Sequence, residues 1–322
     1  MIKRGASDRL GAASSGVVPR RRGRRRRVEH GPVANTLRVA TYNIHKGVLR
    51  DFFGLKRTSR IHELRARLHD LHADLIFLQE VQGKHDRYER RLEQWPMEPQ
   101  DVVLARSPTV KHTFETAYGK NATYLHGHHG NALLSRFPIL QFEQRDISDH
   151  ALEKRGLLHC VVDVGGRPVH CFVVHLGLFG RSRERQAQAL IDWIARDVPL
   201  DAPLIVAGDF NDWRDRLTND LCAELGVCEV FDDLQARRDV AQRVAYYMHD
   251  RLTGLGVNVA KESFRLPRAI RTARTFPALV PWFRMDRIYQ RGFAVDHAEV
   301  LRGPSWARLS DHSPLVADLT PL

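Results

Sequence analysis

Short apolar runs that end on a polar side chain constrain the fold of this chain more than any other feature. Residues 74–81 and 203–209 each contain an apolar stretch of strand length, which is typical of strands buried on both faces of a sheet. In residues 37–43, apolar side chains alternate with other residues, which also indicates a strand. We therefore expect a domain built around buried β-sheet.

A hairpin extends this sheet. Residues 157–164 and 168–176 flank Gly165-Gly166, a dipeptide suited to a two-residue turn with positive φ angles. The register set by this turn places Cys160 opposite Cys171. We interpret all four cysteines of the chain as buried thiols rather than as disulfide partners: Cys160, Cys171, Cys222 and Cys228.

Single helices separate the strands. A helix is predicted from residue 61 to residue 71, where Ile61, Leu64 and Leu68 share a face and Ser59 would cap the N-terminus. A second helix should begin at Ser182. Further strands are expected at residues 131–136, 141–147, 285–290, 293–301 and 315–319. Strand pairs interrupted by single helices favour a layered mixed α/β domain over a regular βαβ series.

Residues 233–270 break this rhythm. Val240, Val244 and Met248 recur at helical spacing, and scattered Arg and Lys follow them. We interpret the segment as a helical insertion that packs on the body of the domain.

Charge divides the chain into two parts. The net charge is +12, but residues 1–36 contain ten Lys or Arg and two acids, so this segment carries +8 and residues 37–322 carry +4. We expect residues 1–36 to form a disordered Arg-rich arm and residues 37–322 to form one catalytic domain. A polybasic arm is attracted to an anionic membrane surface or to nucleic acid. No secretory signal or membrane-length apolar run is present, so we expect a cytoplasmic monomer that the arm could hold at the membrane periphery.

Polar residues at the ends of the predicted strands are the candidates for chemistry. A rigid scaffold presents such side chains to a cleft. Acids and amides together would hold a hard cation such as Mg²⁺, and a histidine held by an aspartate can transfer protons near neutral pH. Taken singly, each is more typical of a turn, a loop or a solvated strand end, and only the set together indicates a site. The candidates are Asn43, Glu80, His175, Asp209, Asn211, Asp286, Asp311 and His312.

The order and local sequence of these residues resemble the endonuclease/exonuclease/phosphatase superfamily, whose fold is the DNase I-like one. The resemblance implies a four-layered α/β sandwich, with two mixed β-sheets face to face and helices outside them. It also implies Mg²⁺-dependent hydrolysis of a phosphoester, with Mn²⁺ as a substitute ion. The segments that carry it are Thr41–His45, Leu78–Val81, Gly130–Arg136, Val174–Gly177, Gly208–Asn211, Arg284–Ile288 and Ser310–Pro314.

The same resemblance implies a role for each candidate. Glu80 would be the principal metal ligand, supported by Asn43 and Asp311. Asp209 would orient or activate the attacking water. The remaining residues would contact the phosphate, transfer protons or stabilise the leaving oxygen, with Asp286 orienting His312: His175, Asn211, Asp286 and His312.

The substrate stays open between a lipid headgroup phosphodiester and a nucleic acid. Apolar residues such as Phe179 and Trp282 would be exposed in a lipid enzyme, and core packing is the alternative. A nuclease would use a basic groove, or the same arginines would form an ordinary solvated surface: Arg181, Arg183, Arg185, Arg214 and Arg216. His128 and His129 either line the cleft or form a polar turn. A non-catalytic module that binds polyanions or membranes through the arm is the alternative from a different class.

Overall fold

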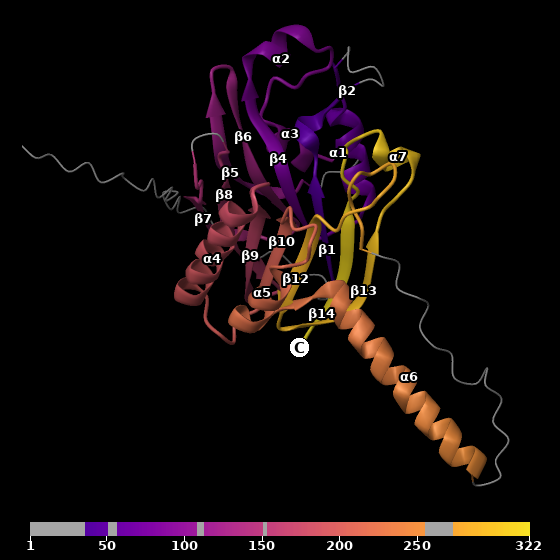
Figure 1. Cartoon of the computed structure of the whole chain (residues 1–322). Coiled ribbons are helices and arrows are strands. Elements are labelled where there is room, and N and C mark those ends of the chain that lie inside the picture. Colours follow the sequence, from indigo (N-terminus) through magenta and orange to yellow (C-terminus); the bar gives the residue numbers. More distant parts are fainter. Residues whose placement is uncertain (1–35, 51–56, 108–112, 151–152, 255–272) are drawn as a thin grey trace, which may run out of the picture.

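Two six-stranded sheets form the centre of the computed structural model, which describes residues 36–50, 57–107, 113–150, 153–254 and 273–322 (Figure 1). The predicted arm therefore lies outside the described residues, except for Thr36. In spatial order the first sheet consists of β13 (Phe293–Val300), β14 (Leu315–Pro321), β1 (Leu37–Asn43), β4 (Leu75–His85), β6 (Gly127–Ser135) and β5 (Glu115–Tyr124). The second consists of β11 (Cys228–Glu229), β12 (Asp286–Arg291), β10 (Leu204–Asp209), β9 (Arg167–His175), β8 (Gly156–Val164) and β7 (Ile139–Asp146).

Both sheets are mixed. In the first, β1 runs parallel to β4 and antiparallel to β14. In the second, β10 runs parallel to β9 and antiparallel to β12. A separate two-stranded sheet joins β2 (Val48–Arg50) to β3 (Arg57–Ser59).

The core has three apolar layers. The inner faces of the two sheets pack on each other through residues such as Phe77 and Ile205. Outside the first sheet, α1 (Ile61–Asp70) and α3 (Gln100–Ala105) cover its outer face, with Leu64 among the buried side chains. Outside the second sheet lie α4 (Gly180–Asp197) and α5 (Thr218–Leu225), with Trp193 against Phe172. The predicted four-layered α/β sandwich is confirmed.

The predicted hairpin is also confirmed, since Cys160 lies opposite Cys171 across β8 and β9. Both thiols are buried and free. The other two cysteines are also free thiols, as predicted, but their predicted burial is wrong, because Cys222 is only half-buried and Cys228 is exposed on the short edge strand β11.

Helix boundaries depart from the sequence prediction in two places. Ser59 belongs to β3, and α1 begins after Arg60 without a side-chain cap. The helical stripe of the predicted insertion lies on α6 (Val230–Gly254), but Val240, Val244 and Met248 are exposed. In Figure 1 this helix projects away from the sheets, so the expectation that the stripe packs on the body is wrong. Residues 255–270 of the predicted insertion lie outside the described residues.

Shorter elements complete the described chain. They are η1 (His45–Gly47), α2 (Asp86–Arg91) and α7 (Pro304–Ala307). No helix among the described residues is both long and apolar enough to cross a membrane.

Candidate active site

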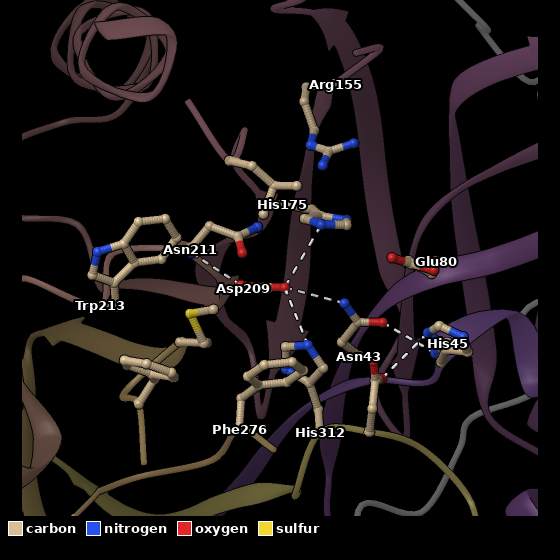
Figure 2. Close-up of a pocket in the computed structure, with 14 residues that line it drawn as sticks. Asn43, His45, Glu80, Arg155, His175, Asp209, Asn211, Trp213, Phe276 and His312 are labelled. Atoms are coloured by element: carbon tan, nitrogen blue, oxygen red, sulfur yellow. Dashed lines mark hydrogen bonds and ion pairs between the residues drawn. The ribbon is translucent and has the colours of Figure 1, made fainter. Parts of the chain in front are cut away.

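A cavity of about 500 Å³ opens where strands of the two sheets end side by side (Figure 2). Its polar lining comes from β1, β4, β9 and β10 and from the loop before β14. Seven of the eight predicted residues line the cavity, and the eighth, Asp286, lies behind His312. The seven are Asn43, Glu80, His175, Asp209, Asn211, Asp311 and His312. Residues up to 269 positions apart in the sequence, from Asn43 to His312, are thus brought to one site.

Asp209 lies at the centre of this arrangement. Its Oδ2 accepts a hydrogen bond from Asn43 Nδ2 at 3.1 Å, and the Nε2 atoms of His175 and His312 lie 3.6 and 3.7 Å away. Its other oxygen, Oδ1, accepts from the backbone N–H of Asn211 at 2.9 Å. Burial raises the pKa of Asp209, and Asp286 adds to this, although His312 opposes it. A carboxyl group with a raised pKa is a suitable proton acceptor near neutral pH.

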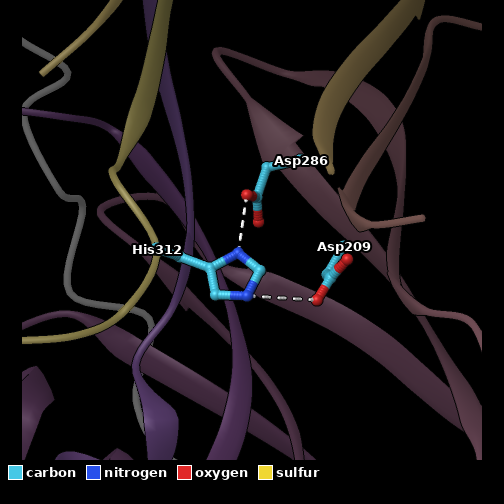
Figure 3. Close-up of side chains that lie close together, drawn as sticks. All are labelled: Asp209, Asp286 and His312. Carbon is cyan, nitrogen blue, oxygen red and sulfur yellow. Dashed lines mark hydrogen bonds and ion pairs between the residues drawn. The ribbon is translucent and has the colours of Figure 1, made fainter. Parts of the chain in front are cut away.

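His312 connects two carboxylates (Figure 3). Its Nδ1 is 2.8 Å from Asp286 Oδ2, and its Nε2 faces Asp209. Burial lowers the pKa of His312, but Asp286 and Asp209 outweigh it and raise that pKa to about 10. We therefore describe His312 as an imidazolium that Asp286 orients, because the proton is held more tightly by the imidazole than by Asp209.

His175 has the opposite electrostatics. Burial lowers its pKa well below the ordinary value, and Arg155 and His129 reinforce this effect. The neutral imidazole can donate or accept one hydrogen bond at the cavity wall. The two cavity histidines therefore carry different charges, which suits them to different roles.

Backbone geometry fixes these side chains. Gly208, with φ of +153°, passes so close to β9 that a Cβ there would lie 1.9 Å from the carbonyl oxygen of Val174. Only glycine allows this approach, which aligns Asp209 with His175 across β9 and β10. Ser310 Oγ donates to the carbonyl of Asn43 at 2.7 Å and accepts from the N–H of His312, so this hydroxyl ties the end of β1 to the loop before β14.

Glu80 does not end its strand as the sequence prediction had it. The strand β4 continues to His85, and Glu80 has φ of +57° at an irregularity between Leu78 and Val81. A glutamate with positive φ is strained and is held by its surroundings, as functional residues often are. The bulge turns the side chain of Glu80 into the cavity from the middle of a strand.

The Glu80 side of the cavity contains two cations that the sequence analysis did not single out. Lys46 Nζ is 3.2 Å from Glu80 Oε2, and His45 Nδ1 is 3.3 Å from Asp311 Oδ1. Burial opposes ionisation of Glu80, but Lys46 and His45 hold its pKa below the usual range. Burial likewise opposes ionisation of Asp311, and the hydrogen bond from His45 lowers its pKa to about 2. Both carboxyl groups are therefore ionised at neutral pH.

The donor set on this side fits a hard divalent cation. Glu80, Asp311 and the amide oxygen of Asn43 offer only oxygen atoms, which Mg²⁺ prefers. Asp209, Asp286 and His312 also offer ligand atoms within 4.8 Å of one another. In that second group, however, both nitrogens of His312 face carboxylates, so we describe the group as suited to proton transfer rather than to metal binding.

Further residues line the cavity that sequence reasoning missed. Arg155 Nε donates to the carbonyl of Leu176, which holds the guanidinium near His175. Nothing in the sequence distinguishes Arg155 from other arginines. His45, which also lines the cavity, ends the recognised segment Thr41–His45, and Lys46 follows it; both have positive φ angles, 45° and 61°.

An apolar wall faces the polar side of the cavity. Figure 2 shows Trp213 and Phe276 on the side away from Glu80 and His45. The apolar lining residues are Leu178, Trp213, Phe276, Phe283 and Met285. The Phe276 ring lies 5.0 Å from the His312 ring, between centroids, so this wall also screens His312 from water.

The alternatives for the two adjacent histidines are both wrong. His128 and His129 belong to β6 rather than to a turn, and neither is among the residues that line the cavity. His128 contacts the Tyr118 hydroxyl at 3.0 Å, and His129 lies close enough to Glu80 to interact with its charge.

Comparison with known proteins agrees with this architecture. The family model described as "Endonuclease/Exonuclease/phosphatase family" matches residues 40–312. The uncharacterized protein YbhP of Escherichia coli (strain K12) is 36% identical over 286 residues, which are 88% of this chain and 96% of that protein.

Solved structures show the same fold at low sequence identity. A family protein from Leptotrichia buccalis C-1013-b superposes with a TM-score of 0.61 and 13% identity, over 87% of this chain and 98% of that one. The D. rerio TDP2 structure in complex with a single-strand DNA product superposes with a TM-score of 0.52 and 17% identity, over 88% of this chain and 98% of that one. The chain belongs to the endonuclease/exonuclease/phosphatase family.

Proposed function

We propose that this chain is a metal-dependent phosphodiesterase that hydrolyses its substrate by in-line attack of an activated water. One observation supports this most strongly: a buried carboxylate, Asp209, lies within 4 Å of Asn43, His175 and His312 at the base of an open cavity. Phosphoryl transfer depends on positioning and on neutralisation of charge, which such groups supply.

The proposed roles follow from the electrostatics. Asp209 accepts the proton of the attacking water, and its raised pKa favours this transfer. The imidazolium of His312 donates a hydrogen bond to a phosphate oxygen, and Asp286 keeps it oriented. The guanidinium of Arg155 and the amide of Asn211 can contact other phosphate oxygens.

The leaving oxygen needs a partner as well. The neutral imidazole of His175 faces Asp209 from the opposite side and can hydrogen-bond to this oxygen. Glu80, Asn43 and Asp311 would hold Mg²⁺ or Mn²⁺, and the bound ion would act as a Lewis acid on the phosphate. Lys46 would then have to leave Glu80, because both cations compete for the same carboxylate.

A substrate panel tests this proposal. Wild-type protein and Asp209→Ala would be incubated with Mg²⁺ and, in turn, with double-stranded DNA, single-stranded DNA, RNA, phosphatidylglycerol and cardiolipin. The expected result is hydrolysis of one class by the wild type and none by the variant. Equal turnover by Asp209→Ala would refute the assigned roles.

A nuclease is the second candidate. Its support is the aromatic pair Trp213 and Phe283 at the cavity, with ring centroids 6.4 Å apart, on which bases could stack. The D. rerio TDP2 structure, which shares the fold, was solved with a single-strand DNA product. A nuclease would cleave the oligonucleotides of the panel and leave the lipids intact.

The setting of the enzyme is part of the proposal. We propose a cytoplasmic monomer whose Arg-rich segment, residues 1–36, is attracted to polyanions. The buried free thiols Cys160 and Cys171 are compatible with a reducing compartment. A non-catalytic module is disfavoured, because all eight predicted polar residues take part in one site.

A further inference from the structure

Six large apolar side chains are exposed beside the cavity, and the mechanism above does not use them. We call them the apolar rim: Leu178, Phe179, Leu279, Val280, Trp282 and Phe283. Leu178 and Phe283 also line the cavity, so the rim borders its mouth. The sequence alternative of core packing is therefore wrong for Phe179 and Trp282, which are 62% and 66% exposed.

Most of the rim belongs to one loop, residues 276–283. The backbone of Phe276 pairs with that of Phe283, which closes the loop, and the N–H of Ala278 donates to the carbonyl of Asp311. These bonds hold the loop against a site residue. Between its ends the sequence Pro-Ala-Leu-Val-Pro-Trp contains no charged side chain, and Leu279 is 80% exposed.

Exposed aliphatic side chains favour a lipid surface over a nucleic acid. Bases stack on aromatic rings, but leucine and valine offer no such platform. A contiguous apolar patch on a protein surface marks an interaction site, and tryptophan is enriched where hydrocarbon meets headgroups. Residues 37–322 carry only +4, so the domain lacks the strong positive field typical of backbone binding.

Unpaired arginines flank the rim. Arg181 follows Leu178 and Phe179, and Arg214 and Arg216 follow Trp213. All three are exposed, and none has an ion-pair partner among the described residues. By contrast, Arg183 is buried and donates to the carbonyls of Gly177 and Leu178, and Arg185 pairs with Asp149. These three arginines follow exposed apolar residues in the sequence, and the Trp213 ring lies 6.4 Å from the rim residue Phe283, between centroids. Their guanidinium groups complement an anionic lipid headgroup layer.

We propose that the apolar rim inserts into the surface of an anionic phospholipid bilayer, so that the cavity receives the phosphodiester of a lipid headgroup. The part concerning the substrate rests on the proposed phosphodiesterase function, whereas binding to the bilayer does not. The two-sided cavity fits this arrangement: the apolar wall continues the rim inward, and the polar side holds the phosphate-binding groups.

Co-sedimentation of the full chain with vesicles tests the docking. The vesicles contain equimolar phosphatidylcholine and phosphatidylglycerol, and high ionic strength screens the charges of the Arg-rich segment and of the three exposed arginines, so that the apolar contribution dominates. We expect Leu279→Ser/Trp282→Ser to lower the partition coefficient about a hundredfold, since removing each buried side chain costs about tenfold. Neither residue lines the cavity, so hydrolysis of the soluble substrate bis(p-nitrophenyl) phosphate should be unchanged.

A matched pair at the far ends of the strands serves as the control. Leu200 precedes β10 and Leu322 follows β14, and both are as exposed as the rim residues. Leu200→Ser/Leu322→Ser should bind vesicles like the wild type. Trp282→Phe should keep binding but lose most of the blue shift in tryptophan emission on vesicle addition.

Two results would overturn the proposal. One is equal vesicle binding by the rim variant and the control variant. The other is a rim variant that still binds vesicles but no longer binds single-stranded DNA. Wild type that binds vesicles through the rim but hydrolyses no phosphodiester would instead contradict the proposed function alone.

Discussion

Asp286→Asn removes the charge that orients His312 and that also helps to raise the pKa of Asp209, while every residue that lines the cavity stays unchanged. The Asp286 carboxylate is completely buried and lies 2.8 Å from His312 Nδ1, so it forms a charge-assisted hydrogen bond. A neutral amide in its place forms a bond weaker by about 1–2 kcal/mol. That loss alone corresponds to a fall of about fivefold to thirtyfold in the rate of phosphodiester hydrolysis.

The amide can also turn its NH₂ group towards Nδ1. His312 would then have to be neutral, and the positive charge that strengthens its hydrogen bond to the phosphate would be lost; losing one such transition-state contact costs about 10²–10³-fold in rate. We therefore expect kcat to fall between about fivefold and about 10³-fold. The fold should lose about the same 1–2 kcal/mol of stability and no more, because the two side chains have the same shape and Asp286 Oδ1 accepts no hydrogen bond from any described residue.

The assay is the initial rate of bis(p-nitrophenyl) phosphate hydrolysis with Mg²⁺, beside a thermal unfolding curve. Asp101→Asn is the matched control, since this carboxylate is buried and bonded to the Thr116 hydroxyl away from the cavity. A kcat within twofold of the wild type in Asp286→Asn would refute the reasoning. So would an equal fall in the control variant.

Three further predictions concern the scaffold and the metal. Gly208→Ala should destabilise the fold by at least about 2 kcal/mol, measured as a lower urea midpoint, because its Cβ would meet the Val174 carbonyl. Gly166→Ala, where a Cβ meets nothing, should cost only about 1 kcal/mol, and equal losses in the two variants would contradict this explanation. His159 is buried against Phe172 and Trp193, and burial lowers its pKa from 6.5 to about 4. Between pH 4 and pH 6.5 the unfolded chain therefore binds more protons than the folded chain, so about 3 kcal/mol of stability is lost as pH falls from 6.5 to 4. His159→Phe should flatten that part of the plot of stability against pH, and an unchanged slope would contradict the prediction. Glu80→Gln should weaken Mn²⁺ binding at least about tenfold by the electron paramagnetic resonance signal of free Mn²⁺, whereas Glu63→Gln on α1 should leave it unchanged.

Periodicity and turn chemistry were sufficient for much of the fold. The apolar runs at 74–81 and 203–209 became the central strands β4 and β10, and Gly165-Gly166 set the observed register of Cys160 against Cys171. Each of these features acts locally, so it can be read from adjacent residues. The packing of α6 could not be predicted in this way, because helical spacing does not say whether an apolar face packs against another element.

The residues that meet at the site could be predicted from the sequence, but their arrangement could not. Polar residues at strand ends identified the side chains, whereas the bulge that turns Glu80 inward depends on the pairing of β4 with β6. Arg155 is held by a carbonyl 21 residues away, and no local pattern encodes such a contact. The apolar wall was missed for a similar reason, because Trp213 and Phe283 meet only after β10 and β12 pair.

The most direct test of the proposed chemistry is the rate of bis(p-nitrophenyl) phosphate hydrolysis by wild type and Asp209→Asn, with Mg²⁺ and after its removal by EDTA. We predict turnover that requires Mg²⁺ in the wild type and falls at least about 10³-fold in Asp209→Asn, although both proteins unfold at similar temperatures. Turnover that persists in EDTA, or that survives in Asp209→Asn, would contradict a metal-dependent phosphodiesterase centred on Asp209.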